Sequence, residues 1–485
     1  MSFISSRRFF KKWAPFIFPM CGSIVFFEPI SAETLKEALA TAYQTNASLA
    51  SAQAGTKAAA ELLAQASAGW WPKAHLFGDV DQEYKDTSQS SYPQNSGYTD
   101  RDGTKVGLEV VQNIYSGGAT EANSQKSEAE VQAANADYKK EEQKLLLAAI
   151  KAYLEVLKSQ SVLDLTLKHE SRLKKQLEQG KARFELGDLT LTDVAQIEAE
   201  LSQATAEHIK AQGELESAQA QYVGVIGKAP DLLVFPEAPL FLPKDKKEAF
   251  EIALHQNPDY IKSQFDEQSR KSNVDIALAA MRPSVDVKLA ATRNSNNDSF
   301  TKKSRVYDGI ATASVKVPLD ISGDAQSKVR KARLEASQKR LATRATRDML
   351  SASISQKMDA LSTTMGQIES FESLVKFKRI AQEGMILEEE LETRTMTDRL
   401  KAETEYFEAQ VKLIDARIKA LTAHFELLGE MGELTLARLD VSTMPYNPES
   451  YVNEVSQAPY NLSPDDNLAS IDKTENVTEE LEKIK

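Results

Sequence analysis

The chain has 485 residues, of which 41% are apolar and 27% charged, with a formal net charge of −12. This composition excludes a wholly disordered chain and a bundle of membrane-spanning helices. The acidic balance also argues against nucleic-acid binding, which needs a basic face.

The first 32 residues have the features of a signal peptide. A basic start that includes Arg7, Arg8, Lys11 and Lys12 precedes an apolar stretch over 13–27, and "ISA" supplies a cleavage site after residue 32. We therefore predict a signal peptide over 1–32 and export from the cytoplasm. The single cysteine lies within this segment, so the mature chain must be stable without disulfides.

The rest of the chain contains two copies of one plan. "LKEALATAYQTN" from Leu35 resembles "KKEAFEIALHQN" from Lys246, and "YSGGA" resembles "ISGDA" about 206 residues later. We predict repeat 1 over 33–235 and repeat 2 over 236–440, each with an opening helix, two strands, a long helix and a shorter helix. The expected bounds are strands 73–84 and 104–114 with helices 118–186 and 192–226, then strands 284–293 and 308–318 with helices 324–390 and 397–431.

The strand segments alternate apolar and polar residues after Pro72 and Pro283. One interpretation is a periplasmic sheet with one wet face. The other is a membrane barrel, which the long polar hairpin tips favour. Four strands cannot close a barrel, so several chains would have to share one: two chains would give eight strands with a filled interior, and three would give twelve with a lumen.

The long helix over 118–186 would span about 100 Å. It is followed by Thr190-x-x-Asp193, and the second long helix by Thr395-x-x-Asp398, 205 residues later. A threonine can cap the backbone N–H groups of a helix start, and an aspartate stabilises its positive end. Each motif therefore predicts a helical hairpin at the far tip of an arm. Beyond residue 440 we expect an acidic, disordered tail over 441–485.

No catalytic constellation stands out. The five histidines are scattered without a metal-ligand spacing, and the sequence shows no nucleophile–base pair. We predict that the protein is not an enzyme and has no catalytic, cofactor or metal site.

The leader, the duplicated plan, the proline-started strands and the tip motif Gly187-x-x-Thr190-x-x-Asp193-Val194 resemble the outer membrane efflux protein family, the TolC-like exit ducts. The resemblance implies a homotrimer with a shared 12-stranded β-barrel in outer membrane lipid and an α-barrel of long antiparallel helices in the periplasm. It also implies a passive, water-filled duct of a tripartite efflux or type I secretion system, gated at its periplasmic tip. The partners would be a periplasmic adaptor (membrane fusion) protein and an inner-membrane pump. Because the pump would choose the cargo, the sequence leaves open whether the cargo is a drug, a metal ion or a secreted protein. The alternative is a periplasmic coiled-coil structural or adaptor protein without a pore.

The resemblance also assigns roles at the tips. Arg394 matches a position that holds the closed state by bonding to the first tip, here Thr192 and Asp193, and Asp398 matches a position that lines the constriction. The chain departs from the family pattern at two places, where it has Lys401 instead of a second acidic residue and Glu389 instead of a tyrosine. The alternative interpretation of these residues is ordinary capping and solvated helix ends.

Overall fold

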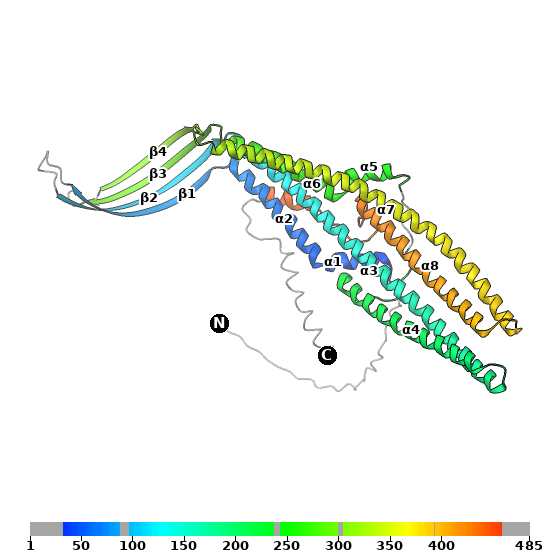
Figure 1. The fold of residues 1–485 in the computed structure, drawn as a ribbon. Helices are drawn as coiled ribbons and strands as arrows, with labels where there is room; N and C mark the ends of the chain where they lie inside the picture. Colours follow the sequence, from blue (N-terminus) through cyan, green and yellow to red (C-terminus); the bar gives the residue numbers. More distant parts are fainter. Residues whose placement is uncertain (1–32, 88–96, 237–242, 299–303, 392, 458–485) are drawn as a thin grey trace, which may run out of the picture.

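The computed structural model describes residues 33–87, 97–236, 243–298, 304–391 and 393–457. A curved sheet forms one end of the elongated molecule, and two helical hairpins form the other (Figure 1). The predicted signal peptide lies outside the described residues. Within them, no helix is long and apolar enough to cross a membrane. The elements are α1 (Leu35–Thr45), α2 (Ala47–Ser67), η1 (Ala68–Trp70), β1 (Lys73–Thr87), β2 (Gly97–Tyr115), α3 (Ala119–Leu186), α4 (Leu191–Ile226), α5 (Lys246–Gln256), α6 (Pro258–Ala279), β3 (Ser284–Asp298), β4 (Ser304–Lys316), α7 (Asp324–Glu390), α8 (Met396–Met431) and α9 (Pro448–Gln457).

The sheet is antiparallel, in the order β1-β2-β3-β4. Its register places Leu76 opposite Leu108, Leu108 opposite Ala291 and Ala291 opposite Gly309. Because directly opposite residues share a face, one apolar face runs across all four strands. The other face is polar, with Lys288 2.6 Å from Glu109. The predicted alternation is thus a property of the whole sheet.

The strands are longer than the sequence predicts at the hairpin end. β1 continues to Thr87 and β3 to Asp298, because polar residues that were expected to form loops still pair through their backbones. At the other end β4 stops at Lys316, two residues short of the expected end. Pro318 has no backbone N–H to add to the ladder.

Each copy opens with two helices, where the sequence analysis expects one. Asn46 ends α1 and begins α2, and its side chain accepts a hydrogen bond from the backbone N–H of Leu49 at 3.1 Å. Asn257 separates α5 from α6 in the same way, with the N–H of Tyr260 at 3.0 Å. The asparagine that ends both "LKEALATAYQTN" and "KKEAFEIALHQN" is therefore a helix cap that breaks the opening segment in each copy.

The arm consists of the hairpins α3–α4 and α7–α8, whose bounds lie within one residue of those expected. α3 is central and packs against α2, α4, α6 and α8, whereas α7 packs against α6, α8 and α5. Side by side, the helices form a layer in which α7 is at one edge and α2 and α4 are at the other. The largest core, where α1, α3, α4 and α8 meet, is built around Leu146, Tyr153, Tyr222 and Phe425.

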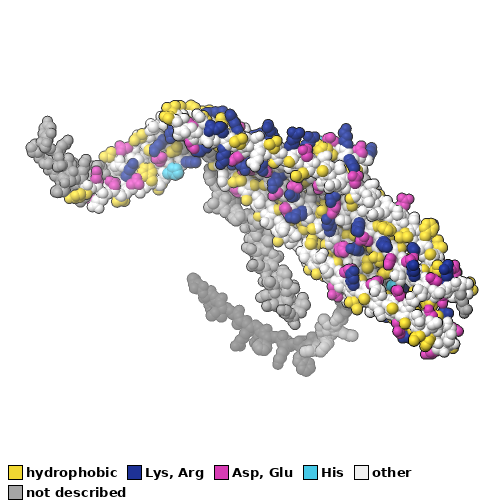
Figure 2. Space-filling view, in the orientation of Figure 1, with side chains coloured by type: hydrophobic (Ala, Val, Ile, Leu, Met, Phe, Trp, Pro, Cys, Tyr) yellow, Lys and Arg dark blue, Asp and Glu magenta, His cyan; other side chains and the backbone are white. Residues whose placement is uncertain are grey.

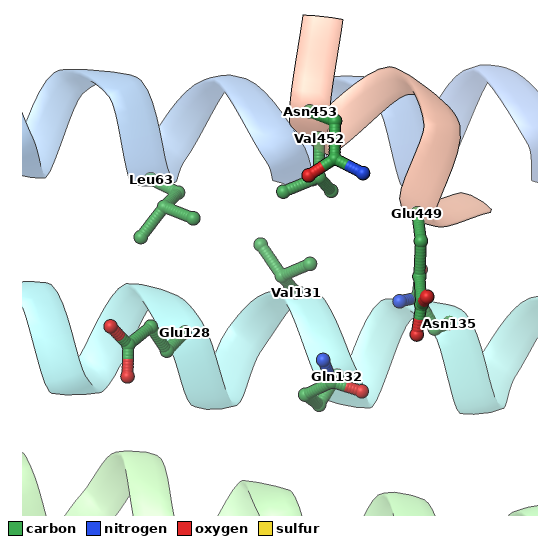
Figure 3. A pocket seen from close by; sticks show the side chains of 8 residues that line it. All are labelled: Leu63, Glu128, Val131, Gln132, Asn135, Glu449, Val452 and Asn453. Atoms are coloured by element: carbon green, nitrogen blue, oxygen red, sulfur yellow. The ribbon is translucent and has the colours of Figure 1, made fainter. Parts of the chain in front are cut away.

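The prediction of a disordered tail over 441–485 is wrong for residues 441–457. Tyr446 fixes this segment: its N–H donates to Tyr43 Oη at 2.9 Å, and its ring meets that of Tyr138 edge-on. The helix α9 follows and lies against α2 and α3 (Figure 3), with Val452 facing Val131. Apolar and aromatic side chains among the Pro, Asn and Ser residues thus give this stretch a packing partner. Residues 458–485 lie outside the described residues.

Candidate functional site at the hairpin tips

The return helices of both tips, α4 and α8, begin with the same capping motif. Gly187 ends α3 with a positive φ of 84°, and Thr190 then caps α4 by accepting the N–H of Asp193 at 3.2 Å, while the Asp193 carboxylate accepts the N–H of Thr190 at 3.0 Å. At the second tip Thr395 and Asp398 make the same reciprocal pair. Each motif satisfies N–H groups that a helix start leaves unpaired.

Arg394 is exposed in the loop of the second tip. Its Nε lies 3.1 Å from Oε2 of Glu388, on the same hairpin, and both side chains are about half exposed. Thr192 is exposed at the first tip, and among the described residues of one chain no hydrogen bond or ion pair joins Thr192 or Asp193 to Arg394. At the ends of the return helices, a 2.9 Å hydrogen bond from Thr397 to Gln196 joins the two tips.

Glu389, which follows Glu388 near the end of α7, is buried, with 4% of its side chain exposed. It accepts from Arg183 of α3 at 2.7 Å and from Arg399 of α8 at 2.9 Å. Burial raises the pKa of the Glu389 carboxyl, but the hydrogen bonds and charges of the two arginines outweigh burial and hold that pKa below its usual value. The carboxylate therefore stays charged and bound to both hairpins.

The contacts continue away from the tip. Arg399 also donates to Glu403 at 3.3 Å, and Glu403 accepts from Gln176 of α3 at 2.6 Å. Arg183, Glu389, Arg399, Glu403 and Gln176 form a continuous network, here called the tip network, that ties α3 to both helices of the second hairpin. Beside it lies a small apolar cluster, which contains Leu173, Ile197, Met396 and Leu400.

Asp398 and Lys401 lie on the first turns of α8. Hydrogen bonds from Thr395 lower the pKa of Asp398, and the charges of Arg394 and Lys401 lower it further. Asp398 is thus a charged carboxylate at neutral pH. Lys401 is exposed close to it, so this turn carries both signs of charge.

Glu389 is among the residues predicted from the sequence, but its partners are not. Glu388, Glu389 and Glu390 form a charge run that reads as a solvated face, and Arg183 is 206 residues away. The available signal was the spacing of Arg399 and Glu403, which places both side chains on one face of a helix. That spacing does not reveal which residue of α3 completes the network.

The opposite end of the molecule carries a second candidate surface, the apolar face of the sheet. Leu76 is 80% exposed, Val80 85% and Val315 69%. Among the described residues, β1 and β4 each pair along one edge only. Open strand edges beside an exposed apolar face are not stable in water or in lipid.

Comparison with known proteins gives a consistent result. Residues 38–228 and 249–433 match the family model for outer membrane efflux proteins. The chain is 25% identical over 445 residues to the outer membrane efflux protein BepC of Brucella suis biovar 1, which covers 91% of this chain and 95% of BepC. It is 23% identical over 423 residues to the outer membrane protein TolC of Vibrio cholerae, with 84% of this chain and 92% of TolC covered.

Solved structures share the fold. The CusC structure has a TM-score of 0.72 at 15% identity and covers 82% of this chain and 92% of CusC. The outer membrane protein VceC of Vibrio cholerae has a TM-score of 0.70 at 19% identity, with 82% and 96% covered. The described helices and the four-stranded sheet therefore have the same fold as these two structures.

Proposed function

Since this chain belongs to the outer membrane efflux protein family, we propose that three copies of it form a passive, water-filled exit duct that is gated at its periplasmic tips. The family places the chain in the outer membrane with a large periplasmic portion, which favours the duct over a periplasmic coiled coil without a pore. The trimer, the gate and the partners are what we propose beyond the family.

The observation that carries the proposal is the open sheet with one apolar face. In lipid the edges of β1 and β4 must be paired, and a second copy offers the complementary edge. The helical layer is open in the same sense, since α7 is at one edge and α2 and α4 at the other. A single kind of head-to-tail contact between copies would pair the free edges of both the sheet and the helical layer. Repeated around an axis, this contact would form a closed ring. Three copies bring twelve strands, enough to leave a lumen.

The length of the arm supports a role across the periplasm. α3 has 68 residues and is about 100 Å long. A duct of this form supplies a path but no energy, so a periplasmic adaptor and an inner-membrane pump would drive transport, in a tripartite efflux or type I secretion assembly. The pump would also select the cargo.

For the gate we propose that the tip network holds the second hairpin against α3 within each chain. Opening would separate the hairpins, and that movement must break the contact of Glu389 with Arg183 and that of Glu403 with Gln176. Arg394 lies further out, and its exposed pair with Glu388 can exchange for a contact with a neighbouring copy at little cost. The buried network would thus be the stronger restraint and Arg394 the weaker one.

The test is single-channel conductance in planar bilayers. Glu389→Gln leaves two arginines facing a neutral amide, and loss of one partner from a largely buried pair costs roughly 3 kcal/mol. We expect a clearly higher conductance for Glu389→Gln and a smaller rise for Arg394→Ala. Glu390→Gln is the matched control, because Glu390 is the exposed neighbour. Equal conductance for Glu389→Gln and the control would remove the tip network from the gate.

A further inference from the structure

A row of arginines occupies one face of α7 close to the sheet. Arg330, Arg333, Arg340, Arg344 and Arg347 follow one another at intervals of three, four or seven residues, which places them on one side of a helix. The arginine row is about 25 Å long. Figure 2 shows Lys and Arg side chains gathered along the edge of the molecule where α7 begins.

The row differs from the lysines around it. Lys328, Lys331 and Lys339 are paired with Asp324, Glu335 and Asp266. Arg330, Arg333, Arg340 and Arg344 are exposed, and none of them has an ion pair with another residue that the structure describes. Arg347 lies over the ring of Phe250 in α5, 5.9 Å from its centroid, so the row ends where α5 covers the helix. A run of unpaired guanidinium groups of this length matches an extended acidic partner.

The chain itself contains a segment of matching chemistry. Residues 458–485, which follow α9, carry seven acidic and three basic side chains. Four of the acidic residues, Asp472, Glu475, Glu479 and Glu482, recur at intervals of three and four. That is the spacing at which one face of a helix presents its side chains, and it repeats the spacing of the arginines.

The position of α9 puts this segment within reach. α9 lies against α3 near Glu128–Asn135, about ten to sixteen residues after α3 leaves the sheet, and the arginine row begins six residues after the start of α7. Both helices run from the sheet toward the tips (Figure 1), so α9 and the row lie at the same level along the arm. Only α6 separates α3 from α7, and helix axes pack about 10 Å apart. An extended chain of 28 residues spans roughly 90 Å, which is several times the distance required.

We propose that the acidic residues of 458–485 bind the arginine row of α7 in the same chain. This contact would lie on α7, at the edge of the layer opposite α9. It neutralises the basic surface just below the sheet. The contact does not depend on how the tips open.

The first test measures how fast phenylglyoxal modifies each arginine in the detergent-solubilised trimer at low salt, read by mass spectrometry. We compare the full mature chain with a variant in which Asp472, Glu475, Glu479 and Glu482 are replaced by Asn or Gln. Several weak exposed ion pairs together should protect the row about fivefold, and the variant should lose that protection. Arg379, on the same helix beyond the row, should react equally in both. High salt should expose the row in the full chain.

A matched control changes Asp465 and Asp466 to Asn, which removes two charges from the same segment outside the spaced group. It should retain most of the protection. If the row reacts equally in the full chain and in the four-site variant, the acidic segment does not cover it. Protection that persists in the four-site variant means that another copy or detergent-bound lipid covers the row, which overturns the proposal as well.

The reciprocal test follows the acidic segment. In the double variant Arg340→Gln with Arg344→Gln, trypsin should cleave after Lys473 several-fold faster than in the unchanged chain at low salt. Arg379→Gln should leave that rate unaltered. An unchanged rate in the double variant contradicts the contact even if the arginines are protected.

Discussion

The helices α3 and α7 occupy the same place in the two repeats and have almost the same length, 68 and 67 residues, yet 23 residues of α3 are buried and only seven of α7. α3 lies between helices on both sides, whereas α7 is at the edge of the layer. The two copies therefore share the element and a glycine at its N-terminal cap, but not its C-terminal cap or its surroundings.

The exposed side of α7 is not simply polar. It carries large apolar side chains along its whole length: Leu334, Leu341, Met349, Met365, Phe377, Ile380 and Leu387. A helix at the rim of a soluble layer would present charged residues there. The difference between α3 and α7 indicates that a second copy of the chain covers the side of α7 that carries Leu334 and Leu341, which is turned roughly 90° from the arginine row around the helix.

The largest expected effect comes from placing charges on that side. Leu334→Asp combined with Leu341→Asp should prevent the trimer from forming, because burying an unpaired carboxylate costs more than the roughly 2 kcal/mol that each buried leucine contributes. Light scattering of the detergent-solubilised protein would report the mass of the assembly. Helix content by circular dichroism should not change, since both leucines are exposed within one chain.

Ala342→Asp is the control, because residue 342 points about 100° away from Leu341 around the helix. Stable trimers of the double aspartate variant would show that α7 is not the covered edge.

A second, intermediate effect concerns a titratable group on the buried side of α3. His169 stacks on Phe407 of α8 at 4.6 Å, and burial, helped by the charge of Arg172, lowers its pKa to about 4. In the folded arm the His169 imidazole stays neutral, while in the unfolded chain it takes up a proton below about pH 6.5. Stability is therefore full above pH 6.5 and falls as the pH drops toward 4, by about 2 kcal/mol between pH 7 and pH 5.

Thermal unfolding midpoints at several pH values would measure this loss. His169→Phe retains a flat ring against Phe407 but cannot titrate, so this variant should lose less stability between pH 7 and pH 5. An identical pH dependence in both proteins would assign the acid sensitivity to other groups.

The smallest expected effect separates the two tips. Asp193→Asn and Asp398→Asn remove equivalent capping carboxylates, and each should cost about 1 kcal/mol or less. We expect only Asp398→Asn to reduce cation preference, measured as the reversal potential in a salt gradient, because three copies of Asp398 would surround the axis. Equal shifts in both variants, or none in Asp398→Asn, would mean that Asp398 is a cap and does not line the constriction.

Elements with a local cause could be predicted from the sequence. The prolines at 72 and 283 start alternating runs, and the Thr-x-x-Asp motifs begin α4 and α8, because caps and strand patterns depend on neighbours a few residues away. The short helices α1 and α5, which precede Asn46 and Asn257, were not predicted, since only one opening helix was expected in each copy.

Features with a distant cause could not be predicted. Glu389 is buried because Arg183 lies opposite it, and Tyr446 is held because Tyr43 is placed 403 residues earlier in the chain. In each case the local sequence indicates an exposed residue: a charge run for Glu389 and a Pro- and Asn-rich stretch for Tyr446. Such contacts follow from the order of the helices in the layer, which no single segment encodes.

The open edges of β1 and β4 also bear on how the protein is made. A newly exported chain cannot complete its sheet alone, so maturation is a concentration-dependent reaction between copies. Slow synthesis would lengthen the time that unpaired strands spend exposed to proteases and to wrong partners. The amount of finished protein in a cell should then rise more steeply than the rate at which chains are delivered.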